Sequence, residues 1–529
     1  MPRTELFTRL RHALRVADRL ERTNVPTEEA LERAAEAAWS RRKFLGTSAA
    51  AVAGAGATLA FPRFARAQES AGPRIVILGA GTSGLTCAYR LQQNGLASTI
   101  LEASPRVGGR MYSLQNFFPD GQTAELGGEL IDTDHYAIRN LAQELGVELV
   151  DLAYLDGSTG HDYYIDSKLY RADADWIEAF RPIAVAIRKD IGDGDENCAV
   201  TFDHATPEGR ALDDMSVAEW IAKHQFSGPI VKVIEAAYVG EYGLQLDEQS
   251  ALNLVCAVGT DEGTFGIFGE SNERFRTRGG NATIPIRLAQ EIQHPIETGT
   301  VVESIRNRGE GFEISVRRGG SSTVIAADIV VTTIPLTVMR KLDLRNLDLT
   351  PVQRGTIENL GYGTNSKMMV GLKARPWMEL NVSAYTFTDL AFQCCWDTSR
   401  GQAGEHAILT NFTGGRQGLV IGQGALQDRA KEFVAQADKV FPGTAAAYTG
   451  KAVRQIWPKY EWTQGSYTCY RPGQYQKYMN SLVQPQGRLI FAGEHTLEEN
   501  GFMNSAVESG DRAATQILSL LGRGQIRAA

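Results

Sequence analysis

Three glycines in the stretch VILGAGTSGL, residues 76–85, have the spacing G-x-G-x-x-G directly after an apolar run. Gly79 allows a tight turn, Gly81 lets a pyrophosphate approach the backbone, and Gly84 lets a helix pack closely on a strand. The N–H groups at the start of that helix can then bind phosphate. Because the chain holds 54 glycines, the spacing alone fits NAD, FAD or a turn without a ligand.

The residues around this motif predict a βαβ unit that would position it. Residues 74–78 (RIVIL) read as a strand, residues 83–94 as a helix from their apolar spacing, and residues 97–102 (ASTILE) as a second strand. The second strand ends in Glu102, whose carboxylate is placed to accept hydrogen bonds from ribose hydroxyls. An acid there favours a nucleotide with a free 2′-OH, which indicates a dinucleotide-binding unit.

Length and composition limit the class of protein. A chain of 529 residues predicts two or three domains, and a net charge of −8 argues against a nucleic-acid partner. The cysteines show no metal-ligand spacing, so no metal site is expected, and they are too sparse for a disulfide scaffold. We expect buried free thiols at all six positions, which are Cys87, Cys198, Cys256, Cys394, Cys395 and Cys469.

The segment Ser40–Ala67 resembles a twin-arginine export signal. Arg41 and Arg42 precede a weakly apolar stretch of small residues, and Ala65-Arg66-Ala67 matches an A-x-A cleavage site. The resemblance implies a bacterial protein carried by the twin-arginine translocase to the periplasm or outside the cell. The preceding 40 residues are longer than usual for such a signal and predict an amphipathic helix. A surface helix of a cytoplasmic protein is the alternative.

Three further motifs carry a family resemblance: EASPRVGGRMYS after residue 101, AELGGELI at residues 124–131, and RLIFAGEHT at residues 488–496. In this order they resemble the flavin-containing amine oxidases, from about Arg74 to Ala514. The family implies an α/β fold, in which a Rossmann-like FAD-binding domain of the GR2 type accompanies a discontinuous α+β substrate-binding domain. We place the FAD domain in residues 73–155, 270–345 and 455–522, and the substrate domain in residues 156–269 and 346–454. Residues 1–67 would be the helix and signal.

The resemblance assigns the FAD contacts. Arg110 would lie against the diphosphate, Glu102 against the adenosine ribose, and Glu494 against the ribityl or pyrophosphate region. In some relatives a cysteine at the position of Ser466 bonds to the flavin; serine cannot, so non-covalent FAD is expected. The complete set of expected cofactor residues is Gly79, Gly81, Gly84, Glu102, Gly109, Arg110, Gly127, Gly128, Val302, Gly493, Glu494 and Met503.

The catalytic residues also follow from the resemblance. Tyr467 and Phe502 match the two walls of an aromatic cage that flanks the substrate nitrogen, although Phe502 lacks the hydroxyl or indole that is common there. Lys367 matches the lysine that holds a water near flavin N5 and assists the reaction with dioxygen. The expected substrate-binding residues are Glu129, Asp132, Trp396, Tyr467 and Phe502.

The expected reaction is the oxidation of an amine by hydride transfer to FAD. Dioxygen becomes hydrogen peroxide, and the imine is hydrolysed to a carbonyl compound and ammonia. Leu130 stands where amino-acid oxidases carry a carboxylate-binding arginine, and Asp132 matches an acid of polyamine oxidases, so an amine is favoured over an amino acid. An L-amino-acid oxidase stays open, since Arg471 could bind a carboxylate. A lipid desaturase or isomerase, a flavoprotein that only binds, and a homodimer also stay open.

Overall fold

A five-stranded parallel sheet carries the glycine motif. The computed structural model describes residues 72–153, 161–171, 173–192, 200, 205–261, 263–269 and 271–523. All neighbouring strands of this sheet run parallel. Its central strands are apolar runs buried on both faces, as parallel sheets require. The strand order is β19 (Leu489–Phe491), β13 (Ile329–Thr332), β1 (Ile75–Leu78), β2 (Ser98–Leu101) and β9 (Ile296–Glu297).

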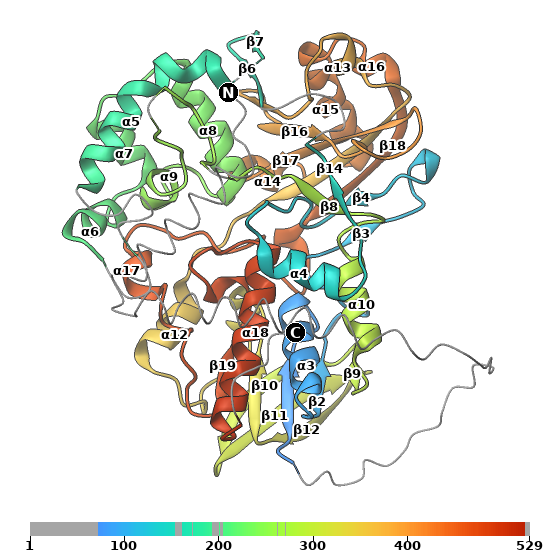
Figure 1. The fold of residues 1–529 in the computed structure, drawn as a ribbon, viewed down its shortest axis with the longest axis vertical. Helices are drawn as coiled ribbons and strands as arrows, with labels where there is room; N and C mark the ends of the chain where they lie inside the picture. The colour runs from blue at the N-terminus through green and yellow to red at the C-terminus, as the bar shows by residue number, and fades with distance from the viewer. Residues whose placement is uncertain are drawn as a thin grey trace, which may run out of the picture. The chain divides into compact units, whose positions relative to one another are not determined.

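Two long helices from opposite ends of the chain pack together over this sheet (Figure 1). Helix α3 (Thr82–Gln93) follows β1, and α18 (Met503–Leu520) is the last described helix. They approach so closely that a Cβ on Gly510 would lie 2.5 Å from the carbonyl oxygen of Ser83. Helices α4 (Tyr136–Glu144) and α10 (Thr283–Glu291) pack beside them.

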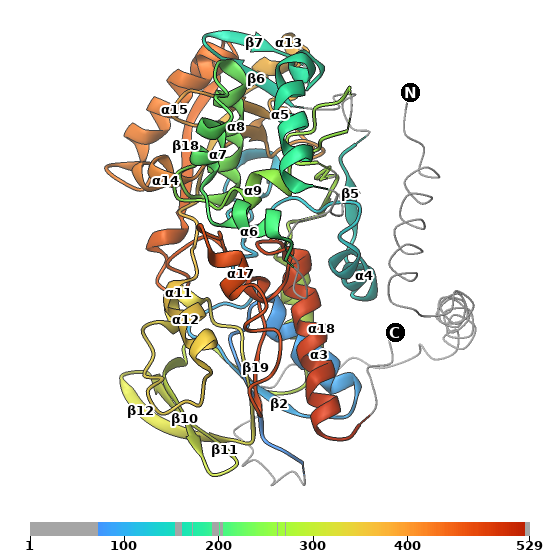
Figure 2. The same ribbon diagram turned by 90° about the vertical axis from the view of Figure 1, so that its left-hand side faces the viewer.

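A separate three-stranded antiparallel sheet lies beside the parallel sheet (Figure 2). It has the order β10 (Val301–Arg308), β11 (Gly311–Arg318) and β12 (Ser321–Ala327). Alternate residues of β11 are buried, which is the pattern of a sheet with one solvent face. Two short antiparallel pairs complete this part: β3 (Ser113–Leu114) with β4 (Ala124–Glu125), and β5 (Leu149–Asp151) with β8 (Phe275–Thr277).

A seven-stranded mixed sheet forms the other part of the structure. Strand β14 of this sheet presents Met368, Val370 and Leu372 to a cluster that includes α15, whereas Met369 packs in a different cluster. Lys367 shares the face of Met369, because side chains alternate along a strand. The sheet order is β18 (Tyr448–Ile456), β14 (Ser366–Leu372), β17 (Ala407–Thr413), β16 (Cys394–Asp397), β15 (Thr386–Thr388), β6 (Asp162–Ile165) and β7 (Lys168–Tyr170).

Helices cover this second sheet and connect the two parts. Among them α8 (Pro229–Tyr242) packs on β6, β15, β16 and β17. Capping boxes at Ser216 and Thr350 fix the starts of two of these helices. The others are α5 (Ile177–Ile191), α6 (Pro207–Asp213), α7 (Val217–Lys223), α9 (Leu252–Val255), α11 (Leu336–Met339), α12 (Pro351–Asn359), α13 (Pro376–Glu379), α14 (Gly415–Val420), α15 (Leu426–Val440), α16 (Thr444–Ala447) and α17 (Gln474–Tyr478).

The α/β fold predicted from the sequence is confirmed, and so is the βαβ unit around the glycine motif. One cysteine prediction is wrong: Cys256 is disulfide-bonded, whereas Cys87, Cys394, Cys395 and Cys469 are free and buried. None of the described helices is both long and apolar enough to span a membrane. The predicted twin-arginine segment lies outside the described residues.

Candidate active site

The glycine loop between β1 and α3 has the shape that a diphosphate site requires. Gly79 has φ +109°, and a Cβ on Gly84 would lie 2.1 Å from the Gly79 carbonyl oxygen, so both positions need glycine. Gly81 is the N-cap of α3 and offers no side-chain cap to the first-turn amides. A Cβ on Gly81 would meet no atom within 4 Å. The loop therefore leaves room beside amides that can bind phosphate.

Glu102 lies next to this loop at the end of β2. Its Oε2 accepts a hydrogen bond from the Ala80 amide at 2.7 Å, and its Oε1 accepts one from the Ser104 amide at 2.7 Å. The Thr300 amide donates to the Glu102 carbonyl oxygen at 2.8 Å, which brings the start of β10 and Val302 to the same edge. Two expected cofactor residues, Glu102 and Val302, are thus assembled beside the glycine loop.

The GGR segment lies against the glycine loop from the other side. Gly109 has φ +56°, and its added Cβ would lie 3.3 Å from the Gly81 Cα. Arg110 Nη1 donates to Glu494 Oε1 at 2.8 Å and to the Ser466 carbonyl oxygen at 2.7 Å. Burial acts to raise the pKa of Glu494, but the charge and hydrogen bond of Arg110, aided by the Gly501 amide, hold that pKa below its usual value.

Four more expected cofactor residues, Gly127, Gly128, Met503 and Gly493, lie at close approaches of the chain. A Cβ on Gly127 would lie 1.8 Å from the Arg110 carbonyl oxygen, and one on Gly128 would lie 2.7 Å from Met503 Sδ. Gly493 has φ +126° and lies under the His495 ring. Burial lowers the pKa of His495 to about 4, so the ring is neutral, and its buried Nδ1 has no hydrogen-bond partner among the described atoms. An orphaned polar atom and glycines at close approaches fit a bound nucleotide.

Two groups near this region, Ser466 and Cys469, bear on the expectation from the sequence that the flavin is not attached covalently. Ser466 Oγ donates to Asn365 Oδ1 at 2.6 Å, so its hydroxyl is held by the protein. Burial raises the pKa of the Cys469 thiol well above its usual range, and Asn253 Nδ2 donates to its sulfur at 3.5 Å. The thiol is therefore an unreactive, protonated group.

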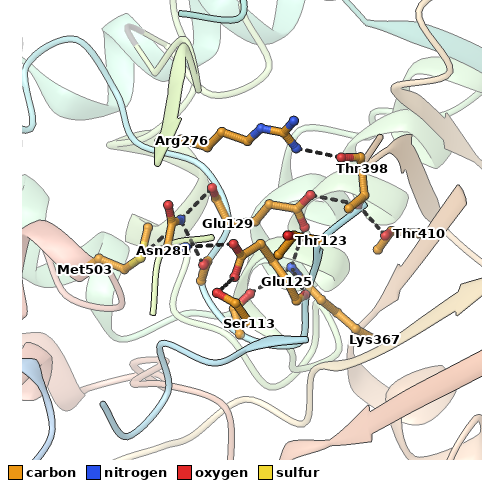
Figure 3. A network of polar contacts seen from close by, with 12 residues as sticks. Ser113, Thr123, Glu125, Glu129, Arg276, Asn281, Lys367, Thr398, Thr410 and Met503 are labelled. Carbon is orange, nitrogen blue, oxygen red and sulfur yellow. Dashed lines mark hydrogen bonds and ion pairs between the residues drawn. The ribbon is translucent and has the colours of Figure 1, made fainter. Parts of the chain in front are cut away.

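Lys367 is buried, only 4% exposed, and is paired with an acid. Its Nζ donates to Glu129 Oε2 at 2.9 Å and to the Gly127 carbonyl oxygen at 2.8 Å (Figure 3). The rings of Trp396 and Phe412 have their centroids 5.0 Å and 5.8 Å from Nζ. The predicted catalytic lysine, the predicted substrate residue Glu129 and the predicted cofactor residue Gly127 therefore form one cluster.

The two predicted cage residues come from different segments that meet. Phe502 is the N-cap of α18, and a Cβ on the preceding Gly501 would lie 3.3 Å from the Tyr467 ring. The Tyr467 hydroxyl donates to the Glu241 carbonyl oxygen. The ring of His135 lies 5.0 Å from that of Phe502, between centroids.

Asp132 has its carboxylate engaged inside the protein. Its Oδ1 accepts from the Asn272 amide at 2.8 Å, its Oδ2 accepts from Ser271 Oγ at 2.9 Å, and His135 Nε2 lies 3.5 Å from Oδ2. Asp132 thus fixes His135 and the loop before β8. Arg471 lies elsewhere, 45% exposed at its side chain and paired with Glu248 at 3.4 Å.

A small aromatic cavity is lined by Trp396 and by Glu241, whose carbonyl oxygen accepts the hydrogen bond from the Tyr467 hydroxyl. Its volume is about 40 Å³, and two acids, Glu241 and Glu273, lie in its wall. Burial, with the nearby Asp132 charge, raises the pKa of each acid to about 7. Its lining residues are Ala237, Gly240, Glu241, Phe268, Glu273, Tyr385, Phe387, Cys394, Trp396 and Phe412.

Sequence reasoning missed four polar residues of the site: Glu125, Glu241, Glu273 and Thr398. Glu241 reads as an ordinary residue of a helix, and Glu273 as part of a polar loop. Glu125 is named in the AELGGELI motif but carries no signal of its burial. The positive φ of Glu273, 45°, is a sign of a constrained site that only the structure reveals.

Comparison with known proteins identifies the class to which this fold and site belong. A family model for flavin containing amine oxidoreductases matches residues 82–518, and the chain belongs to that family. An amine oxidase (flavin-containing) from Danio rerio is 24% identical over 460 residues, covering 85% of this chain and 86% of that protein. An L-amino-acid oxidase from Siganus canaliculatus is 25% identical over 461 residues, covering 84% and 85%.

Solved structures share the fold. Putrescine oxidase bound to putrescine superposes with a TM-score of 0.71 at 21% identity, covering 84% of this chain and 99% of that one. Cyclohexylamine oxidase from Brevibacterium oxydans gives a TM-score of 0.71 at 22% identity, covering 85% and 100%. The protein is therefore an enzyme of the flavin amine oxidoreductase family, and the residues assembled around Gly79, Glu102 and Arg110 fit its flavin.

Proposed function

We propose that this enzyme oxidises a primary amine, with FAD bound non-covalently and dioxygen as the electron acceptor. The observation that carries the proposal is the cavity beside Tyr467. Its described lining residues include two acids and several aromatic rings and no basic side chain. Carboxylates and ring faces attract an ammonium group and repel the carboxylate of an amino acid.

The chain's own residues would bind and orient the amine. FAD, when bound, accepts the hydride from the carbon that carries the amine nitrogen. Tyr467 and Phe502 provide apolar walls that exclude water and hold that carbon in place. Glu241 and Glu273, each with a pKa of about 7, can take or release a proton near neutral pH. Dioxygen leaves as hydrogen peroxide, and water hydrolyses the imine to a carbonyl compound and ammonia.

A peroxide assay tests this function against its nearest rival. Purified enzyme is given a panel of primary amines, diamines and L-amino acids at equal concentrations. We expect peroxide from amines with a kcat/KM at least about tenfold above that for any amino acid. One ion pair changes the difference in binding free energy between the two substrates by about 1–2 kcal/mol. A higher kcat/KM for L-amino acids would replace the amine by an amino acid as substrate.

The second candidate, an L-amino-acid oxidase, is supported by the similarity to the enzyme from Siganus canaliculatus. The pH dependence of KM separates the two. As pH rises through about 7, Glu241 and Glu273 ionise, and the binding of an ammonium should strengthen whereas that of a carboxylate should weaken. Glu241→Gln should raise KM for the amine about tenfold, while the surface change Ser519→Ala should leave it unchanged.

We also propose that the enzyme is exported by the twin-arginine route. The proposal rests on the segment from Ser40 to Ala67 and on the disulfide of Cys256, because disulfides persist in oxidising compartments.

The proposal that FAD is bound non-covalently rests on two groups. The Ser466 hydroxyl is held by a hydrogen bond within the protein, and the Cys469 thiol is protonated. Denaturation in acid should therefore release all of the flavin into the supernatant.

A further inference from the structure

Lys367 forms one ion pair through its buried ammonium among the described residues, with Glu129, and the buried carboxyl group of Glu125 also interacts electrostatically with it. Its Nζ donates to Glu129 Oε2 at 2.9 Å, and to the carbonyl oxygens of Gly127 at 2.8 Å and Glu125 at 3.3 Å. The Lys367 and Glu129 side chains are only 5% and 4% exposed. With three acceptors, the ammonium uses all of its donors (Figure 3).

Glu129 is itself held from the opposite side. Thr398 Oγ1 lies 2.7 Å from Glu129 Oε1 and 2.6 Å from Thr410 Oγ1. Arg276 Nη1 donates to the Thr398 carbonyl oxygen at 2.6 Å, which fixes the backbone of that residue. Each oxygen of the Glu129 carboxylate therefore has a partner within the protein.

The pair has a direct electrostatic consequence. An ammonium shielded from water is stable only with a nearby negative charge, because burial favours the neutral amine. The Trp396 and Phe412 rings add cation–π attraction at centroid distances of 5.0 Å and 5.8 Å, but they carry no net charge. Removal of the Glu129 charge would therefore leave the Lys367 ammonium buried without the carboxylate that pairs with it.

We propose that Glu129 is the positioning residue that keeps Lys367 a fixed ammonium and thereby sustains the reaction of the reduced flavin with dioxygen. This inference rests on the proposed function through the role of Lys367. Dioxygen takes two electrons and two protons and leaves as hydrogen peroxide, and a nearby positive charge stabilises the negative charge that develops on oxygen. Glu129 acts only through the lysine.

The test measures the oxygen reaction without any amine. Protein loaded with FAD is reduced by light under anaerobic conditions, then mixed with oxygenated buffer at pH 6 to 10 in a stopped-flow instrument. Lys367→Met should slow reoxidation about tenfold or more at every pH. Glu129→Gln should slow reoxidation toward the Lys367→Met rate, and more strongly as the pH rises, because the buried ammonium has lost its paired carboxylate. Glu129→Asp, which retains the charge, should restore the wild-type profile in part.

A second measurement uses the flavin-free protein. The Glu129→Gln and Lys367→Met substitutions should each lower Tm, because each leaves a buried partner, whereas the double substitution should lower it by less than the sum. Asp162→Asn is the matched control, a 3% exposed acid that accepts hydrogen bonds from Ser383 at 2.9 Å and 3.0 Å. Combined with Lys367→Met, this control should lower Tm by the sum of the two single losses. It should leave the pH dependence of the reoxidation rate unchanged.

The outcomes separate the inference from the proposed function. If no amine is oxidised but Glu129→Gln still changes the pH dependence of the reoxidation rate, the proposed substrate class is wrong and the proposed role of Glu129 is supported. If Glu129→Gln reoxidises like the wild type at every pH, or if the two Tm losses add fully, Glu129 does not sustain the charge of Lys367. Should Glu129→Gln fail to fold, Thr398→Val should give a smaller shift in the same direction, and an unchanged profile would overturn the inference.

Discussion

The Arg110–Glu494 pair joins two segments of the flavin site through one buried carboxylate. Glu494 has a side chain that is 5% exposed, and Arg110 is 25% exposed, so the acid depends on the guanidinium more than the reverse. Oε2 of the same acid accepts from the Gly501 amide at 2.9 Å, directly before the cage residue Phe502. One residue thus connects the flavin loops with the wall of the substrate site.

We expect Arg110→Met to lower the free energy of unfolding by about 3 kcal/mol at pH 7, since it leaves a buried carboxylate unpaired. The pKa of Glu494 is lowered in the folded protein, so the contribution of the pair is present above the unfolded pKa, near 4.5, and is lost as pH falls. Urea unfolding at pH 7 and pH 4 measures the difference. Glu494→Gln in the same chain should recover part of the loss, and an equal loss at both pH values would contradict the assignment.

Glu125 has the opposite pH dependence. Burial raises its pKa to about 8, with a further contribution from the Glu129 charge, against hydrogen bonds from Ser113 and the Asn281 amide. The folded state binds this proton more tightly than the unfolded state, so its stabilising contribution is complete below about pH 4.5 and is lost as pH rises through 8.

Glu125→Gln mimics the neutral acid, so it should remove the part of the pH-dependent loss of stability that comes from ionisation of Glu125. Between pH 5 and 8 the wild type should lose up to about 1.4 kcal/mol per pH unit relative to the variant. Tm values of the two flavin-free proteins over this range make the comparison. Parallel Tm curves would show that Glu125 does not titrate in this window.

Sequence patterns predicted single residues well where the signal was local. Gly79 and Gly84 could be assigned from spacing because the positive φ of Gly79 and the close approach of Gly84 to the Gly79 carbonyl oxygen are local steric needs. The pairing of Lys367 with Glu129 could not, since 238 residues separate them and nothing in either segment specifies the other. The acids of the cavity were missed for the same reason.

At the scale of elements, the site depends on how closely α3 and α18 pack. Ser83 Oγ lies 2.8 Å from Ser509 Oγ, and Arg90 Nε donates to Asp511 at 2.8 Å. Because α3 presents the first-turn amides and α18 begins directly after Phe502, their contact aligns the cofactor site with the cage. The sequence predicted helix α3 within one residue at each end, but it gave no indication of this crossing.

Gly510→Ala should separate these helices. The new Cβ would lie 2.5 Å from the Ser83 carbonyl oxygen, a backbone atom that cannot move alone. We expect a loss of about 1–3 kcal/mol in the free energy of unfolding, and a lower FAD content of the purified protein. Thermal unfolding and the ratio of flavin to protein absorbance measure both. The exposed change Ser519→Ala on the same helix should alter stability by less than about 0.5 kcal/mol.

At the scale of the whole molecule, the predicted location depends on the paired arginines ahead of the described residues. If the twin-arginine route carries this enzyme, replacing Arg41 and Arg42 by lysine should retain the yellow, FAD-loaded protein inside the cytoplasm of a bacterial host. Fractionation of cells followed by flavin fluorescence measures this. Arg15→Lys in the same region is the control and should leave export unchanged. Export that persists in the double-lysine variant would rule out this route.

The parallel sheet has a consequence for the time at which the enzyme becomes functional. Strand β1 pairs with β13, and β13 pairs with β19 at residues 489–491. Arg110 pairs with Glu494, which is 384 residues later in the chain. At about 5–20 residues per second, synthesis of the 384 residues from Arg110 to Glu494 takes roughly 20–75 s. The flavin pocket is therefore completed only after these residues have emerged from the ribosome, and the edge of β13 that pairs with β19 must stay unpaired until then. We expect this distant pairing to make completion of the cofactor site a slow step of folding.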